Sequence, residues 1–385
     1  MAILYRGENM VTQERLLSEF LNLLQINSPS KGERELADFL INRLSGLGME
    51  VEEDGAGAEI GGSAGNVIGR WAARVKGAPS LLLAAHMDTV ESTAGINLME
   101  KDDKIFTNGT TILGADDKAG IAAILEALRV VREKGLPHGE ITVVFTVAEE
   151  VGLLGAKSLQ GQGLRADLGY VLDSGGPVGT VINHAPAEED IRIEVFGRSA
   201  HAGVNPEEGI NAIQVAGAIL TQLPMGRLDE ESTANIGVIR GGKATNIVPD
   251  YVEMQGEIRS RDEVKLNKLV EEWREIVADT ASKLGSRANY NHERVYQSFK
   301  VEPNHPVIKV VETALKEMDL PMNIKPRGGG SDTNIFNAMG IPSINLGIGM
   351  EKNHSPEEYI NKSDLFNAAC LVLSIINTAA KQQDF

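Results

Sequence analysis

Hydrophobic and polar positions follow two distinct patterns along this chain. In the first and last parts, short apolar runs alternate with helical patterns, and polar residues follow each run. The runs are LLLAA, ITVVFTVA, LGYVL and PSINLGIG, which begin at residues 81, 141, 168 and 342. Continuous β-rich runs separated by helices are typical of parallel strands buried on both faces. The pattern therefore predicts an α/β unit with a mostly parallel sheet.

Helical periodicity predicts amphipathic helices over residues 11–25 and 31–47. A third helix, rich in small residues, begins at Ala119 and ends at Gly135. Shorter helices are expected in GLLGAKSL, which begins at Gly152, and at Ser331 or Asp332 in RGGGSDTNIF.

The second pattern covers residues 183–297. DIRIEVFG alternates with period two, as a half-exposed strand does. Two helices and three further strands are expected after it, and Asn205 with Pro206 fits the start of the first helix. Their predicted ranges are 206–222, 232–240, 250–259, 262–284 and 288–296. The order βαββαβ is that of a ferredoxin-like α+β unit, so we expect an α/β unit of residues 1–182 and 298–385 interrupted by this insertion of residues 183–297.

Composition excludes several classes of protein. The 385 residues include 37 Lys and Arg against 54 Asp and Glu, a formal net charge of −17, which disfavours nucleic acid and anionic membrane as partners. The single cysteine, Cys370, lies in an apolar run and suits a reducing compartment. Residues 1–20 lack the pattern of a secretory signal, and no apolar run approaches the ~18 residues of a membrane span. We therefore expect a cytoplasmic protein.

Polar side chains of a few types follow the predicted strands or open a helix. The carboxyl ends of parallel strands meet at one edge of an open α/β sheet, where ligands bind, so we expect these side chains to converge. They are His86, Asp88, Asp116, Asp117, Glu149, Glu150, Asp173 and His354.

The charges of this set favour bound metal. Asp116, Glu150 and Asp173 bring three negative charges, whereas His86 and His354 are neutral ligands. Two divalent cations balance three carboxylates and a hydroxide, and without them the carboxylates would repel one another. Each of these residues or pairs, taken alone, has a simpler explanation, such as a solvated turn, a helix cap or an acid at a helix start. Together they indicate a two-metal site, with a ligand set that suits zinc and also admits cobalt or manganese.

Five motifs, in order along nearly the whole chain, carry a resemblance to a known family. HMDTV, GADDKAG, AEEVGLLGAK, DSGG and NHSPEEYI resemble the binuclear zinc exopeptidases that include peptidase T, carboxypeptidase G, aminoacylase and succinyl-diaminopimelate desuccinylase. GADDKAGIA is most similar to the peptidase T branch. The resemblance implies that Asp116 bridges two metals, that His86 and Asp173 complete one site, and that Glu150 and His354 complete the other.

The resemblance also implies roles beside the metals. Glu149 would be the general base, which takes a proton from the attacking water and passes it to the leaving amine. Asp88 would hold the ring of His86. In the family the peptide bond after the bridging aspartate is cis, which here is the bond between Asp116 and Asp117.

Substrate contacts are expected mainly from the insertion. SAHAGVNPEEGINA resembles the inserted-domain motif whose histidine, here His201, contacts substrate and in dimeric members reaches the other subunit's site. Asn246 and Arg259 match substrate-binding positions, and an arginine suits a bidentate grip on a carboxylate. Arg327 and Gly329 belong to a glycine-rich loop similar to one that lies against the substrate backbone in the family.

The sequence thus predicts a two-zinc peptidase of short peptides, similar to tripeptide aminopeptidases. A carboxypeptidase or an N-acyl-amino-acid amidohydrolase of the same family is the first alternative, because it would share the metal ligands. A catalytically silent peptide-binding protein is the second, against which the presence of Glu149 and of every matched ligand argues. The sequence leaves the oligomeric state open: the edge of the inserted sheet could pair across a two-fold axis in a homodimer, as it often does in family members.

Overall fold

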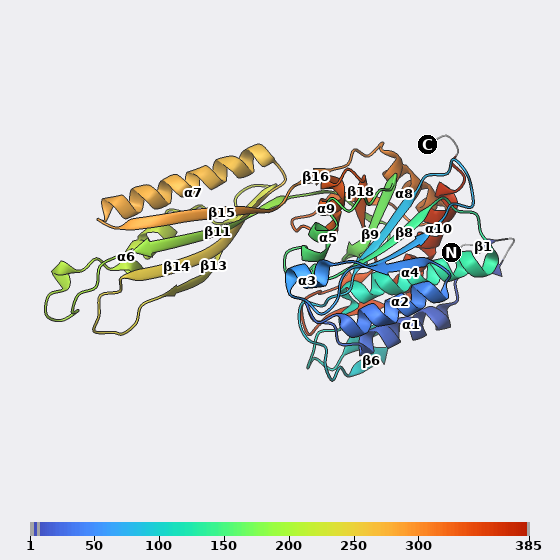
Figure 1. Cartoon of the computed structure of the whole chain (residues 1–385), viewed down its shortest axis with the longest axis horizontal. Coiled ribbons are helices and arrows are strands. Elements are labelled where there is room, and N and C mark those ends of the chain that lie inside the picture. The colour runs from blue at the N-terminus through green and yellow to red at the C-terminus, as the bar shows by residue number, and fades with distance from the viewer. Residues whose placement is uncertain (1–3, 6–7, 383–385) are drawn as a thin grey trace. The chain divides into compact units, whose positions relative to one another are not determined.

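The computed structural model describes residues 4–5 and 8–382. The predicted lack of a signal segment therefore rests partly on residues outside this range. The chain divides into two compact units (Figure 1). The sheet unit comprises Met1–Asn183, Lys300–Pro326 and Ser331–Phe385, and the inserted unit comprises His184–Phe299 and Arg327–Gly330. The insertion was expected over residues 183–297, and the inserted unit additionally takes in the four residues from Arg327.

The main sheet of the sheet unit has the strand order β16-β10-β18-β9-β5-β8-β4-β3, with β17 beside β10. The neighbours β18, β9, β5 and β8 run parallel, whereas β10, β4 and β3 pair antiparallel. The sheet is therefore parallel at its centre and antiparallel toward its edges. Its strands are β3 (Glu50–Glu53), β4 (Val67–Trp71), β5 (Leu81–His86), β8 (Ile141–Thr146), β9 (Leu168–Ser174), β10 (Thr180–Ala185), β16 (Phe299–Lys300), β17 (Asn323–Pro326) and β18 (Ser343–Gly347).

Helices pack against this sheet and against one another. All six residues of β5 and of β8 are buried, so both faces of the sheet centre are covered. On one face, alternate residues such as Leu82 and Val144 pack with Leu159, Phe336 and Ile341. Helix α4 packs against β5 and β9, and α1 and α10 pack against α4. The helices are α1 (Gln13–Gln25), α2 (Arg34–Gly46), α3 (Ala56–Ile60), α4 (Ala115–Lys134), α5 (Leu154–Ser158), α8 (Pro306–Glu317), α9 (Asp332–Ala338) and α10 (Lys362–Ala379).

Two smaller sheets complete the sheet unit. One pairs β1 (Leu4–Tyr5) with β2 (Glu8–Asn9). The other has the order β19-β20-β7-β6, and its strands are β6 (Leu98–Lys101), β7 (Lys104–Thr107), β19 (Met350–Glu351) and β20 (Tyr359–Asn361). Among the described residues, no helix combines the length and apolar character that crossing a membrane requires.

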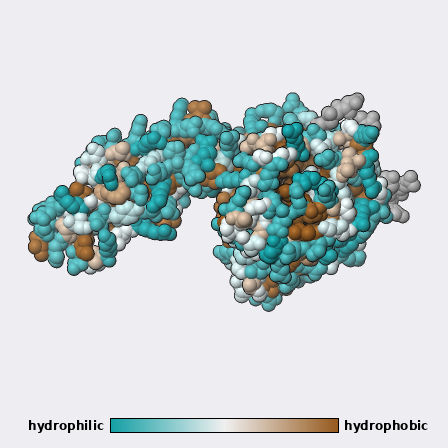
Figure 2. All heavy atoms as spheres, viewed as in Figure 1, coloured by the Kyte–Doolittle hydropathy of each residue, from teal (hydrophilic) through white to brown (hydrophobic). Residues whose placement is uncertain are grey.

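The inserted unit has the predicted ferredoxin-like order βαββαβ, with one additional two-residue strand, β12, between α6 and β13. Its antiparallel sheet runs β12-β13-β14-β11-β15, and α6 and α7 enclose a core around Trp273. Much of the surface visible in Figure 2 is hydrophilic, but the exposed residues of this unit include Val204 and Ile239. The elements are β11 (Ala187–Phe196), α6 (Ala212–Leu220), β12 (Gly226–Arg227), β13 (Ser232–Gly241), β14 (Tyr251–Ser260), α7 (Glu263–Lys283) and β15 (Arg287–Tyr296).

The helix expected over residues 206–222 is shorter than predicted. Pro206–Glu208 form only a 3-10 turn, after which Gly209 is extended. The amide of Asn205 donates to Glu208 instead of accepting from the backbone, with 2.5 Å between Nδ2 and Oε2. Asn211 is the actual cap of α6, since its Oδ1 accepts the N–H groups of residues 213 and 214 at 3.0 and 3.1 Å.

Candidate metal centre and active site

Three neighbouring parallel strands bring the predicted residues to one edge of the sheet. His86 is the last residue of β5, Asp173 lies near the end of β9, and Glu149 and Glu150 follow β8. In the sheet, β5 lies between β8 and β9. Residues separated by more than 80 positions in sequence therefore meet at the carboxyl edge, as expected for an open α/β sheet.

Asp116 reaches the same edge from the start of α4. Asp116 and Asp117 have non-helical backbone angles, and the peptide bond between them is cis, as the resemblance predicted. Gly120 allows the helix to approach β9 closely, because a Cβ atom there would lie 2.4 Å from the carbonyl oxygen of Leu172. The second glycine of GADDKAG thus brings the start of α4 beside Asp173.

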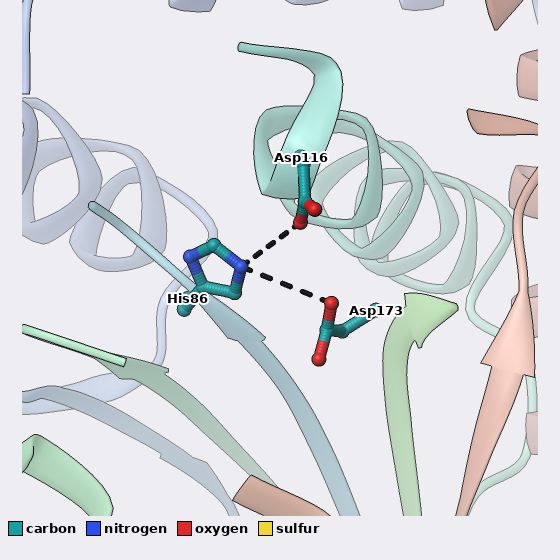
Figure 3. A group of neighbouring side chains, drawn as sticks. All are labelled: His86, Asp116 and Asp173. Atoms are coloured by element: carbon teal, nitrogen blue, oxygen red, sulfur yellow. Dashed lines mark hydrogen bonds and ion pairs between the residues drawn. The ribbon is translucent and has the colours of Figure 1, made fainter. Parts of the chain in front are cut away.

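The candidate ligands form two groups that share Asp116. One group is His86, Asp116 and Asp173, and the other is Asp116, Glu150 and His354. In each, one ligand atom from every residue lies within 4.8 Å of the others. Figure 3 shows the first group, with the ring of His86 facing Asp116 from α4 and Asp173 from β9. A further group joins His86 to Glu149 and Glu150, so Glu149 lies beside the ligands.

Contacts within the first group are short. His86 Nε2 lies 3.0 Å from Asp116 Oδ1 and 3.8 Å from Asp173 Oδ1. Asn345 fixes Asp173, because its Oδ1 accepts the Asp173 N–H at 3.1 Å and its Nδ2 donates to Asp173 Oδ2 at 3.4 Å. One ring nitrogen thus faces two carboxylates that are already oriented.

The second group uses the other oxygen of the shared aspartate. His354 Nε2 lies 2.9 Å from Glu150 Oε1 and 3.4 Å from Asp116 Oδ2. Asn353 Nδ2 also donates to Asp116 Oδ2, at 2.7 Å. The buried Oδ1 of Asn353 accepts no hydrogen bond, and the buried Oε1 of Glu150 faces the ring of His354. A buried oxygen atom without a protein donor is suited to a cation, which would satisfy it.

Charge is concentrated at this edge. Although burial opposes it, hydrogen bonds to Asp116 and Asp88 and nearby carboxylates raise the pKa of His86 well above its ordinary value. Hydrogen bonds to Asp116 and Glu150 raise the pKa of His354 to about 10. Burial, reinforced by the Asp173 carboxylate, raises the pKa of Glu149 well above its usual range. The cluster therefore favours bound positive charge, as protons or as metal cations.

Asp88 lies beside the ring of His86, as expected, and also contacts the backbone that follows β8. The ring Nδ1 of His86 lies 2.8 Å from the backbone carbonyl of Asp88 and 3.6 Å from its carboxylate. The carboxylate accepts the N–H groups of Glu149 at 2.9 Å and Glu150 at 3.2 Å, and the hydroxyl of Ser30 at 2.6 Å. Asp88 thus connects the ends of β5 and β8.

Sequence reasoning missed several buried polar residues around the site. Glu358 accepts the N–H groups of Gly114 at 2.7 Å and Asp116 at 3.0 Å and so holds the backbone of the shared ligand. Asp332, at the start of α9, accepts the Thr146 hydroxyl at 2.5 Å. The quoted motifs contain Glu358 and Asp332, but acids at such positions usually mark only a turn or a helix start. The others are Glu33, Asn66 and Asn345, together with the half-buried Asn353.

The predicted substrate residues all belong to the inserted unit, where they form two separate groups. His201 pairs with Ile247, next to Asn246. Arg259 makes a bidentate pair with Glu257 at 3.0 and 2.7 Å. A Cβ atom added at Gly329 would lie 3.8 Å from Arg259 Nη1. The backbone N–H of Arg327, two residues before Gly329, donates to the carbonyl of His184 at 2.9 Å.

The fold and its carboxyl-edge cluster define a hydrolase of the peptidase class with an inserted α+β unit. The chain belongs to peptidase family M20/M25/M40, whose sequence model matches residues 82–378. A solved tripeptidase from Staphylococcus aureus is 40% identical over 97% of this chain and 100% of that one, with a TM-score of 0.93. An aminopeptidase PepT from Bacillus cereus is 41% identical over the same shares, with a TM-score of 0.89.

Peptidase T of Geobacillus kaustophilus is 26% identical over 94% of this chain and 98% of that protein. The family and the peptidase T branch expected from the motifs are therefore confirmed, and so is peptide hydrolysis as the general activity.

Proposed function

We propose that the protein is a two-metal exopeptidase of short peptides, with the activity of a tripeptide aminopeptidase. The observation that carries the proposal is that Asp116 belongs to both ligand groups while Glu149 lies beside them. The residues present fit two divalent cations, because imidazole and carboxylate ligand atoms gather there and the buried Oδ1 of Asn353, beside Asp116, accepts no hydrogen bond. The mixture of imidazole and carboxylate favours zinc, with cobalt or manganese as substitutes.

Two bound cations would lower the pKa of a water molecule between them and polarise the substrate carbonyl. His86, Asp173 and the shared Asp116 would hold one cation, and Glu150 and His354 would complete the ligands of the other. Glu149 takes a proton from the attacking water and gives it to the leaving amine. Burial and the Asp173 carboxylate raise the pKa of Glu149, and a raised pKa makes its ionised carboxylate a stronger base for the first step.

We propose that the inserted unit binds the substrate through Arg259 and the loop at Arg327 and Gly329. Pairing with Glu257 occupies Nε and Nη2 of the guanidinium, while Nη1 faces the backbone at Gly329. A carboxylate or carbonyl oxygen of the peptide near that loop would contact the guanidinium group of Arg259, which is held in a fixed orientation.

Strand register supports a contribution from a second copy of the chain. Arg259 is paired with Glu188 near the start of β11, and Tyr251 is paired with Phe196 at its end. These eight steps correspond to about 27 Å at ~3.4 Å per residue, and His201 lies beyond them, paired with Ile247. An extended tripeptide spans only about 10 Å. One substrate cannot contact Arg259 and His201 of the same unit, so we propose a homodimer that supplies His201 and Asn246 from the partner subunit.

A peptide panel tests the function. The purified protein, loaded in turn with zinc, cobalt and manganese, is offered free, N-acylated and C-amidated tripeptides. The proposal predicts that free and C-amidated tripeptides lose their N-terminal residue, whereas N-acylated ones do not. Preference for N-acylated substrates would instead favour the amidohydrolase alternative. Absence of turnover with every metal would favour a peptide-binding protein.

A further inference from the structure

The turn that carries Glu149 and Glu150 is held by side chains from three distant parts of the chain. After β8 ends at Thr146, four successive backbone N–H groups, those of residues 147–150, leave the strand ladder. We call these residues the 147–150 turn. Buried N–H groups need acceptors, and here every acceptor is a side-chain oxygen.

Glu33 and Asn66 supply the first two acceptors, and Asp88 supplies the others. Asn66 Oδ1 accepts the N–H of Val147 at 3.1 Å, and Glu33 Oε1 accepts that of Ala148 at 3.1 Å. Asp88 accepts the N–H groups of the two glutamates, as described above. Glu33 and Asn66 are fully buried, and they lie 115 and 81 residues from their partners.

Carbonyl groups of the turn are satisfied as well. The carbonyls of Val147 and Ala148 accept N–H groups from Gly155 and Leu154 at 3.0 and 3.1 Å. Asn66 connects the turn to the start of α5, because its Oδ1 accepts from Val147 and its Nδ2 donates to the Gly155 carbonyl at 2.8 Å. With both sides bonded, Ala148 takes a φ of 51°, a left-handed conformation that is unfavourable for alanine.

We propose that Glu33 and Asn66 are positioning residues of the hydrolytic site. They fix the 147–150 turn so that Glu150 faces His354 while its neighbour Glu149 remains directed at the reacting water. The proposal rests on the function proposed above. Adjacent residues that serve different partners need a rigid backbone, since a misplacement of about 1 Å at a reacting group can lower the rate on the order of 10²-fold.

Three variants of buried glutamates distinguish an effect on the position of the 147–150 turn from a general loss of protein stability. Glu33→Leu removes the acceptor, whereas Glu33→Gln keeps an oxygen for both bonds that Oε1 accepts, from Lys31 and Ala148. The matched control is Glu126→Leu on α4. Glu126 is also fully buried, but it accepts from Thr12 and Arg15 and has no contact with the ligand groups.

The first readout does not depend on activity. Hydrogen exchange of the 147–150 amides, followed by mass spectrometry, should be at least about tenfold faster in Glu33→Leu than in the wild type. Glu33→Gln and Glu126→Leu should retain wild-type protection there. Unchanged protection in folded Glu33→Leu would overturn the proposal whether or not the protein hydrolyses peptides. Wild-type turnover on the peptide panel separately tests the proposed function.

The second readout is steady-state kinetics with metal content measured on the same samples. Glu33→Leu should lower kcat about 10- to 100-fold with KM nearly unchanged and both metals bound, and Glu33→Gln should restore most of kcat. An equal loss of kcat in Glu126→Leu, or an unchanged kcat in folded Glu33→Leu, would overturn the assignment. If Glu33→Leu does not fold, Asn66→Leu is measured in its place with the same expected and contrary results.

Discussion

Replacing Asp116 and replacing Asp117 should have very different consequences, although the two are identical neighbours. Asp116 directs Oδ1 to His86 at 3.0 Å and Oδ2 toward His354 at 3.4 Å. Asp117 instead accepts the backbone N–H groups of His86 at 3.2 Å and Gly120 at 3.3 Å. Despite burial, hydrogen bonds to His354 and His86 keep the pKa of Asp116 well below its usual range, whereas burial raises that of Asp117.

The size of the effect follows from the ligand count. Structural zinc sites with four ligands contribute about 10–16 kcal/mol, so one ligand is worth on the order of 2.5–4 kcal/mol. Because Asp116 belongs to both ligand groups, Asp116→Asn should weaken both metals, each by about 10²–10³-fold in Kd. Asp117→Asn keeps an oxygen that can accept a backbone hydrogen bond, and we expect less than about a tenfold change.

Metal titration with a competing chelator, followed by melting curves of each loaded and stripped protein, measures these values. Metal bound only by the folded state stabilises it by about 2.7 kcal/mol when the metal concentration is 100 times Kd. Chelation should therefore lower the melting temperature of the wild type and of Asp117→Asn markedly, and that of Asp116→Asn much less. Two tightly bound metals in Asp116→Asn, or equal losses in both variants, would refute the shared-ligand assignment.

Three further predictions concern other residues. Glu149→Gln should lower turnover by about 10²–10⁴-fold with both metals still bound; loss of metal, measured by elemental analysis, would mean that Glu149 and Glu150 have exchanged roles. His201→Ala should lose most turnover without changing metal content or melting temperature. If subunits exchange, mixing this variant with Glu149→Gln should restore some activity. No recovery in dimers that have exchanged subunits would contradict a role for His201 in the partner subunit's site. Burial lowers the pKa of Lys118 from 10.5 to about 7, so between these values the unfolded chain binds a proton that the folded chain lacks, and stability rises with pH. The free energy of unfolding is measured by urea denaturation of chelator-treated protein at about pH 7 and about pH 9. Lys118→Met should reduce the increase between the two pH values. An increase as large as that of the wild type would show that Lys118 is not its source.

Most of the candidate ligands could be predicted from sequence because their signals are local. A buried strand must be apolar until it leaves the sheet, so the polar residues that end such runs, as His86 and Asp173 do, are conspicuous. Asp116 was recognisable from its glycine-flanked motif. The start of α6 was missed because the sequence around Asn205 and Asn211 offers two acceptable caps, and the extended backbone at Gly209 decides between them.

The sequence alone determined the alternation of buried strands and helices, the interrupted α/β architecture and the residue types available to bind metal, because these depend on periodicity and on side-chain chemistry. Only the tertiary structure decided which atoms serve which partner. The carboxylate of Asp88 lies closer to the backbone of the 147–150 turn than to His86, and Glu33 and Asn66 support that turn from far away in sequence. The physical reason is that a buried N–H group takes whichever acceptor folding brings within about 3 Å. No local pattern specifies a partner 115 residues away.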